Sequence, residues 1–291
     1  MTITLHGPAA DELGAAIDAL ASWQGEGGVM QLHPGDLGWT GRFGAAAAAA
    51  AAAALRTWSR GGRVVALGLV DAPDLLRMTI APDLRSDEEL AARLAADLGD
   101  PAAGVLPTGS VSVEAPMDAL LQDALFAAGW VPDEEWTPLR LDLGASVAAP
   151  DLRVEVAGPD LAEQRVAVQR AAFERSTFTV EAWQTMAAGP AYADARCLVG
   201  FDAAGAAVAA MTVWSAGVGR PGLIEPMGVH RDHRGHAYGR AICLAGAQEL
   251  QRLGASSVVV TTPSANAAAI AAYRSAGFEP FGASRDLRRR S

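Results

Sequence analysis

Apolar runs of the length of a β-strand alternate with helical stretches along this chain. The strand-like runs are Arg63–Val70, Val111–Glu114, Ala207–Val213, Leu223–Val229 and Ser257–Thr262. A helical pattern opens after Val229 and ends near Leu253, and another covers Ala267–Ala276. Because helices between strands pack on the faces of a sheet, the pattern predicts a mixed α/β fold.

The same pattern occurs twice. The segment L-F-A-A-G-W from Leu125 resembles Y-R-S-A-G-F from Tyr273, which lies 148 residues further on. In addition, M-T-I-A-P-D-L-R from Met78 aligns with M-G-V-H-R-D-H-R from Met227 at an offset of 149 residues. A nearly constant offset in two separate segments indicates duplication of a unit of roughly 145 residues. We therefore expect two domains, 1–143 and 152–291, with a linker of small residues at 144–151.

A loop rich in small residues stands at the start of the longer of the two predicted helices. It runs R-G-H-A-Y-G-R from Arg234 to Arg240, and its small residues are Gly235, Ala237 and Gly239. They let the backbone turn and leave N–H groups free at a helix N-terminus, a geometry that binds phosphate or pyrophosphate. The Gly-x-Gly-x-x-Gly spacing of the dinucleotide fingerprint is absent. A P-loop is also excluded, because the chain contains no lysine. An ordinary strand–helix turn is the alternative interpretation.

Two motifs together resemble the GNAT (GCN5-related N-acetyltransferase) superfamily. R-x-x-A-x-G from Arg234 is similar to that family's acyl-coenzyme A loop, Arg/Gln-x-x-Gly/Ala-x-Gly/Ala. N-x6-Y-x3-G-F from Asn266 is similar to its second hallmark, and the two motifs follow in the family's order with a helix and a strand between them. The resemblance implies an α/β protein of two tandem GNAT-like domains, each a mixed, mostly antiparallel sheet flanked by helices.

The resemblance also implies acetyl-coenzyme A as co-substrate. The residues expected to bind it are Met227, Gly228, Val229, Arg234, Gly235, His236, Ala237, Tyr238, Gly239, Arg240 and Asn266. The strand would offer backbone groups to the pantetheine arm, and the N–H near Val229 would polarise the thioester carbonyl. As an alternative, Asn266 caps the helix that follows it.

The activity implied by the resemblance is transfer of an acetyl or short acyl group to an amine, by direct attack in a ternary complex. Tyr273 would protonate the leaving thiolate, and Glu225, the only acid of its strand, would deprotonate the amine directly or through water. Packing of Tyr273 in the last helix and pairing of Glu225 with an arginine or with solvent are the alternatives. His230, near the same strand end, is a competing base. His230, His233 and His236 occur every three residues, a spacing that could suggest a metal site. Because neither a cysteine nor a carboxylate pair lies nearby, we expect no metal.

The first copy carries acids where the second carries small residues. It has S-D-E-E-L from Ser86 where the second has G-H-A-Y-G from Gly235, and Leu125 stands at the position of Tyr273. Three consecutive acids would repel a pyrophosphate and instead suit the start of an ordinary helix. We therefore expect 1–143 to be a degenerate, non-catalytic copy that supports the fold and walls the acceptor site.

Charge and composition narrow the possible partners. Residues 1–148 carry 8 Arg and 20 acids, whereas residues 149–291 carry 15 Arg and 13 acids, so the half with the phosphate loop is the less acidic one. The net charge of −10 argues against a nucleic-acid partner. With no apolar run long enough to cross a bilayer apart from alanine, no recognisable signal peptide and two cysteines, we expect a cytoplasmic protein without a membrane partner. A small-molecule amine is the expected acceptor, and a homodimer is possible.

Two further segments are candidates for lining an acceptor pocket. His33, Asp36 and Trp39 form a polar–aromatic cluster that could contribute to an acceptor pocket or to a domain contact, and a turn with satisfied side chains is the alternative. Phe178 and Trp183 could form an apolar wall, for which core packing is the alternative. For the chain as a whole, the competing hypothesis is a non-catalytic acyl-coenzyme A sensor or interaction module. A pure binder, however, would not need a proton donor at the end of the cofactor site.

Overall fold

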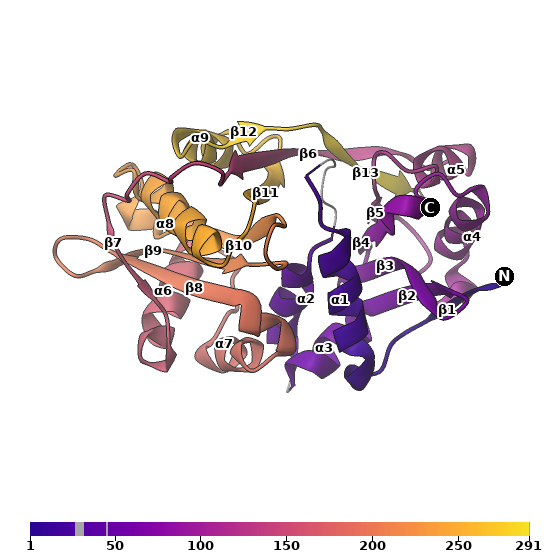
Figure 1. Ribbon diagram of the computed structural model, residues 1–291, viewed down its shortest axis with the longest axis horizontal. Coiled ribbons are helices and arrows are strands. Elements are labelled where there is room, and N and C mark those ends of the chain that lie inside the picture. Colours follow the sequence, from indigo (N-terminus) through magenta and orange to yellow (C-terminus); the bar gives the residue numbers. More distant parts are fainter. Residues whose placement is uncertain (27–31, 45, 291) are drawn as a thin grey trace.

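The computed structural model describes residues 1–26, 32–44 and 46–290, which fold into two halves of similar architecture (Figure 1). The elements of the first half are β1 (Ile3–His6), α1 (Leu13–Trp23), α2 (Pro34–Thr40), α3 (Ala47–Ala54), β2 (Leu55–Arg60), β3 (Arg63–Ala72), β4 (Leu75–Ile80), α4 (Glu88–Gly99), β5 (Val111–Glu114), α5 (Leu121–Ala127) and β6 (Val131–Asp142). Those of the second half are β7 (Arg153–Val156), α6 (Ala162–Ala172), α7 (Val180–Ala187), β8 (Ala195–Phe201), β9 (Ala207–Trp214), β10 (Gly222–Val229), α8 (Tyr238–Arg252), β11 (Ser257–Pro263), α9 (Ala267–Ser275), β12 (Glu279–Pro280) and β13 (Ser284–Arg289). Short 3-10 turns connect several of them, including η2 (Gly41–Phe43).

Each half repeats one strand order. β1, β2, β3 and β4 are antiparallel neighbours, and β4 pairs with β5 in parallel. In the same way β7, β8, β9 and β10 are antiparallel neighbours, and β10 pairs with β11 in parallel. Met78 and Met227, which the sequence repeat aligns, lie in the equivalent strands β4 and β10. The predicted fold class, two tandem α/β units with mostly antiparallel sheets, is confirmed.

The two halves exchange their last strands. β6 pairs with β13 near its start, where Val131 lies opposite Arg288, and with β11 further along, where Asp142 lies opposite Ser257. β13 in turn lies between β5 and β6. Within the described residues, thirteen strands form one sheet in the order β1-β2-β3-β4-β5-β13-β6-β11-β10-β9-β8-β7, with β12 paired to β6. In Figure 1, β6 runs along the top of both halves. The domain limits 1–143, 144–151 and 152–291 stay a prediction.

Helices cover both faces of the sheet in each half. In the first half, α4 and α5 pack on one face around Trp58 and Met78, and α1 and α3 pack on the other around Leu55. In the second half, α8 and α9 cover one face, and α6 and α7 cover the other. Apolar side chains on both faces of the sheet explain this arrangement. In β8, Leu198 points to the α8 side, and its neighbours Cys197 and Val199 point to the α6 side. No helix among the described residues is long and apolar enough to cross a membrane.

Helix α2 joins the two halves. A Cβ atom on Gly35 or Gly38 would lie within 2.4 Å or 2.3 Å of the Trp214 ring of β9, so glycine is required for this close approach. His33, which precedes α2, accepts a hydrogen bond from Gly35 N at 2.9 Å through Nδ1, and its Nε2 lies 3.3 Å from Pro221 O in the second half. Burial lowers the pKa of His33 to about 4, so the ring is neutral at pH 7. The predicted polar–aromatic cluster is therefore a contact between the halves.

Candidate active site

The second half opens between β10 and β11. These parallel strands pair only at Gly222–Val258 and Leu223–Val259, after which they diverge. The space between them, which we call the slot, is a cavity of about 340 Å³. Its walls include both catalytic candidates, Glu225 and Tyr273.

A second cavity, the loop cavity, lies beside the loop that begins α8. It has a volume of about 510 Å³, and ten of the eleven predicted cofactor residues line it. These are Met227, Gly228, Val229, Arg234, Gly235, Ala237, Tyr238, Gly239, Arg240 and Asn266. The exception is His236, whose ring stacks on Tyr238 with the centroids 5.6 Å apart. The structure therefore brings the predicted set together around one space, which leads into the slot.

The loop presents free backbone donors to this cavity. Gly235 adopts a φ of 83°, and Ala237, the residue before α8, adopts a φ of 60°. Within the described part of the chain, the N–H groups of residues 235–240 donate to no protein acceptor. A turn of this kind at a helix N-terminus is an anion site, because both the free N–H groups and the helix dipole favour negative charge.

Two arginines fix the loop to its neighbours. Arg234 Nη2 donates to Ala172 O at the end of α6 at 3.0 Å, and Arg240 Nε donates to Ser275 O at the end of α9 at 2.9 Å. Both side chains thus bind carbonyls at helix C-termini, where positive charge is favourable. They remain on the lining of the loop cavity.

The equivalent loop of the first copy is filled by its own side chains. The Asp87 carboxylate accepts a hydrogen bond from Leu90 N at 2.8 Å and pairs with Arg60 Nη1 at 2.6 Å. The hydrogen bond from Arg60 lowers the pKa of Asp87 to about 2. Arg85 lies 2.6 Å from Asp118 and ties the loop to the segment before α5. The acids predicted to exclude a pyrophosphate therefore cap α4 and form ion pairs.

Tyr273 lies on α9 and reaches the slot from a buried position. Its ring packs against Phe278 with the centroids 5.7 Å apart, and the residue is 5% exposed. Burial, with Cys243 and Glu225 adding to it, raises the pKa of the hydroxyl well above its ordinary value. Among the described residues the hydroxyl has no hydrogen-bond partner. It is thus a protonated donor that lines the slot, and its ring packs in the core as the alternative interpretation expected.

Asn266 caps α9 and also lines two of the cavities. Its Oδ1 accepts a hydrogen bond from Ala269 N at 3.2 Å, which caps α9. The same residue lines both the loop cavity and the slot. Any contact it makes with a ligand is therefore made from a side chain already fixed by the helix.

Glu225 stands at an irregularity of β10. The pairing with β9 shifts by one residue between Ile224 and Met227, and the Glu225 carbonyl accepts a hydrogen bond from Trp214 Nε1 at 2.7 Å. Its carboxyl group lies 3.8 Å from Arg77 Nη1 and shares a hydrogen bond with Asp36, and both partners belong to the first half. Burial first, and then the Asp36 carboxylate, raise the pKa of Glu225 well above its ordinary value.

The first half supplies one wall of the slot, which the sequence motifs did not show. Arg77 of β4 binds Asp36 at 2.7 Å through Nη1 and Glu114 at 2.8 Å through Nε. The remaining contributors from this half are Asp71, Leu75 and Trp136.

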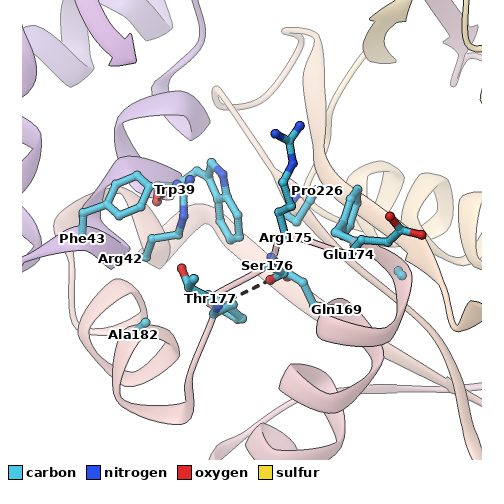
Figure 2. A pocket seen from close by; sticks show the side chains of 13 residues that line it. Trp39, Arg42, Phe43, Gln169, Glu174, Arg175, Ser176, Thr177, Ala182 and Pro226 are labelled. Atoms are coloured by element: carbon cyan, nitrogen blue, oxygen red, sulfur yellow. Dashed lines mark hydrogen bonds between the residues drawn. The ribbon is translucent and has the colours of Figure 1, made fainter. Parts of the chain in front are cut away.

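A third space, the aromatic cavity, lies between the halves and has a volume of about 860 Å³. Figure 2 shows Trp39, Arg42 and Phe43 of the first half on one side and the segment from Glu174 to Thr177 on the other. Trp39 packs against Phe178 with ring centroids 5.4 Å apart. Of the predicted acceptor residues, Trp39 and Phe178 line this cavity, Asp36 lines the slot, and Trp183 is a buried core residue.

The histidines of the loop take no part in these cavities. The His230 N–H donates to Val208 O of β9, and its ring lies at the end of β10 with Nδ1 3.3 Å from Asp232 N. His230 lines none of the three cavities. Over the residues that the structure describes, no group of three or more His, Cys, Asp or Glu side chains is placed to hold a metal ion.

The second half of the chain is similar to a known protein family. Residues 161–278 match the model of the acetyltransferase (GNAT) family, and this range contains the loop, β10, β11 and α9. The loop, β10, β11 and α9 of this chain are therefore similar to the GNAT family, whose members transfer acetyl groups from acetyl-coenzyme A.

Solved structures resemble the chain over its whole length. A GCN5-related N-acetyltransferase from Sphaerobacter thermophilus is 18% identical with a TM-score of 0.60, covering 99% of this chain and 95% of that chain. A tandem GNAT protein from the clavulanic acid biosynthesis pathway is 22% identical with a TM-score of 0.62, covering 99% and 98%. A GNAT-family acetyltransferase from Colwellia psychrerythraea is 14% identical with a TM-score of 0.62, covering 100% of both chains. These similarities show the tandem GNAT fold. No curated protein matches the chain significantly.

Proposed function

We propose that the protein transfers an acetyl or other short acyl group from coenzyme A to the primary amine of a small molecule, by direct attack while both are bound. One observation carries the proposal. The loop cavity, the slot and the aromatic cavity adjoin, and Phe173 lines all three. A co-substrate in the loop cavity and an acceptor in the aromatic cavity would meet in the slot, where Glu225 and Tyr273 lie.

The residues present fit the co-substrate. The free N–H groups of residues 235–240 and the charges of Arg234 and Arg240 suit a pyrophosphate. Because the His230 N–H points to β9 and directions alternate along a strand, the N–H groups of Met227 and Val229 point toward the slot. They would hold the pantetheine arm and polarise the reacting carbonyl. Acyl-coenzyme A supplies the thioester carbon that bonds to the amine nitrogen.

The chain's own residues handle two protons. The amine arrives as an ammonium group, and its nitrogen keeps one of three protons in the amide product. Glu225 takes the first proton before attack and gives it up to solvent before the next amine is deprotonated. Tyr273 donates a proton to the leaving sulfur as the carbon–sulfur bond breaks, and it regains the second nitrogen proton through solvent.

Two measurements test this proposal. We expect calorimetry to show one acetyl-coenzyme A site on the full chain, and we expect a panel of primary amines to contain acceptors that cause thiol release. Binding without release by any amine would favour the non-catalytic sensor instead. Two sites would show that the first copy also binds, and no binding would refute the proposal.

A further inference from the structure

We propose that the active site is composite, and that Asp36 of the first half and Glu225 of the second form a carboxyl pair that binds the acceptor's ammonium group and takes its proton, with Arg77 as a positioning residue. The inference rests on the proposed acyl transfer and extends it. It assigns the acceptor class as a primary amine on an apolar body. It also gives the degenerate copy a direct part in the reaction.

The geometry places this pair across the boundary between the halves. Asp36 lies in α2, and its Oδ2 accepts a hydrogen bond from His33 N at 2.6 Å while its Oδ1 binds Arg77. The Asp36 side chain is 2% exposed, whereas that of Glu225 is 29% exposed and can be reached from the slot. Both carboxyl groups lie against the same Arg77 Nη1, Asp36 Oδ1 at 2.7 Å and Glu225 Oε2 at 3.8 Å, and a hydrogen bond between them requires one proton. The pair therefore carries one negative charge while it holds this proton, and it carries two negative charges once the proton has left.

Counting the pair itself, carboxyl groups outnumber arginines here, with Asp36, Glu225, Asp71 and Glu114 against Arg77 and Arg42. The groups that face it from neighbouring elements are Asp71 of β3, Arg77 of β4, Glu114 of β5, His33 before α2, Arg42 of η2 and Tyr273 of α9. Burial raises the pKa of Glu114 to about 7, and the neutral His33 adds no charge at pH 7. A buried region with this balance favours an incoming cation, since a charge there must be compensated by a partner.

The environments of the two carboxyl groups shift their pKa values in opposite directions. Burial opposes ionisation of Asp36, but Arg77, the hydrogen bond with Glu225 and the His33 N–H together hold its pKa below its ordinary value. Glu225, whose pKa is raised, is therefore the member that holds the proton. An ammonium group bound between them would expel that proton to solvent, and Glu225 would then take one from the nitrogen. The pair returns to its starting state, and one proton is released for each amine bound.

The aromatic cavity indicates what carries the amine. Pro226 and Phe173 line both this cavity and the slot, so an elongated acceptor would extend from one to the other. The Trp39 and Phe178 rings offer a flat apolar surface, and the Arg42 guanidinium lies over the Trp39 ring at 3.9 Å. An aromatic or similarly flat body would bury its area there.

Asp36→Asn is the decisive variant, with 2-phenylethylamine as the acceptor probe and Asp83→Asn as its control. Asp83 belongs to the same half, is exposed and pairs only with Arg63 at 2.6 Å among the described residues. We expect Asp36→Asn to raise KM for the amine about 10-fold or more. Since Asp36 raises the pKa of Glu225, its loss should also move the acidic limb of the kcat/KM profile to lower pH. Acetyl-coenzyme A affinity and all values for Asp83→Asn should stay unchanged. An unchanged KM and pH profile in folded Asp36→Asn would overturn the proposal.

A measurement on the unaltered protein covers the case in which Asp36→Asn fails to fold. Calorimetry of 2-phenylethylamine in two buffers of different ionisation enthalpy should show release of about one proton per amine at pH 7. 3-Phenylpropionate should not bind, and n-propylamine should bind about 10-fold more weakly or worse, because it lacks the flat body. No proton release, or equal binding of the propionate, would refute the carboxyl pair. Amine binding with proton release but no thiol release would leave the ammonium site standing and defeat the acyl-transfer proposal instead.

Discussion

In the first copy the loop before α4 ends in Asp87, whereas in the second copy the loop before α8 ends in Ala237. Both loops follow equivalent strands and open equivalent helices. In the first, a carboxylate of the chain accepts the hydrogen bond of the Leu90 N–H. In the second, the N–H groups of residues 235–240 face a cavity. The same backbone site is thus satisfied from within in one copy and faces a cavity in the other, where we propose that a phosphate binds.

The comparison also separates two roles of the duplicated unit. In the first half the equivalent loop is filled by Asp87, and this half also lines the slot with Asp36, Arg77 and Glu114. Under the proposed composite site, a duplicated domain without an anion loop of its own would still take part in the chemistry. The surface that faces the other copy can stay in use.

Adding a charge to the second loop should give the largest effect. Gly239→Glu places a carboxylate at the first turn of α8, where a Cβ would meet Ala272 at 3.4 Å and Val229 at 3.7 Å, which are ordinary contacts. We expect the helix to persist and the Kd for acetyl-coenzyme A to rise about 100-fold or more, because like charges meet at the phosphate position. Ser86→Glu in the exposed first loop is the matched control and should leave the Kd unchanged. Retained affinity in Gly239→Glu would contradict the assignment of the loop.

Removing the Tyr273 hydroxyl tests whether the second copy keeps a chemical step. Tyr273→Phe should lower kcat about 100-fold, because the leaving sulfur loses its proton donor, while the ring still packs on Phe278. Thiol release under saturating substrates measures the change, and calorimetry should show the cofactor Kd unaltered. A kcat within twofold of the parent would assign Tyr273 to packing alone. A substitution at the equivalent position of the first copy, Leu125→Ala, should change only the stability of the fold, since Leu125 is fully buried.

Removing the internal anion of the first copy should affect stability. Asp87→Ala deletes the N-cap of α4 and should lower the free energy of unfolding by about 1 kcal/mol. The folded pKa of Asp87, about 2, lies below its ordinary value of 3.8, so its contribution is present above pH 4 and is lost as pH falls toward 2. Denaturant unfolding at pH 6 and at pH 2.5 should therefore show a difference between parent and variant that shrinks at the lower pH. A constant difference would mean that the carboxylate charge is not involved.

Removing the backbone strain at Ala237 in the second loop should give the smallest effect. Ala237 adopts a left-handed φ of 60°, which costs an L-residue more than it costs glycine. Ala237→Gly should raise stability by roughly 0.5 kcal/mol after the entropy of glycine is counted. Thermal unfolding measures it, with Ala241→Gly inside α8 as a control that should destabilise instead. A fall in Tm for Ala237→Gly would show that its Cβ makes a contact worth more than the strain.

The strand–loop–helix part of the site was predictable from the sequence because it is local. Arg234, Gly239 and Val229 lie within a dozen residues, so one motif and the strand before it place them together. Asn266 and Tyr273 follow from a second motif on a single helix. His236 has the right neighbours and stacks on Tyr238 instead, because side-chain direction within a turn depends on dihedral angles that a motif does not specify.

The wall contributed by the first half was not predictable in the same way. Asp36 and Glu225 meet across 189 residues of chain, and their contact depends on how α2 docks on Trp214. Neither residue alone specifies a contact between the halves, since Asp36 could also belong to a turn and Glu225 could also pair with an arginine or with solvent. The strand exchange was equally hidden, since β6 and β13 have ordinary strand patterns and nothing in them names their partners.

The exchange of β6 and β13 has a consequence for how the protein is made on the ribosome. β5 acquires its neighbour β13 only after about 170 further residues have been synthesised. Until then the first half carries an unpaired strand edge, and its sheet stays incomplete while the second half emerges. The sheet should therefore be completed only once β13 has emerged, and neither half produced alone has all of its strands.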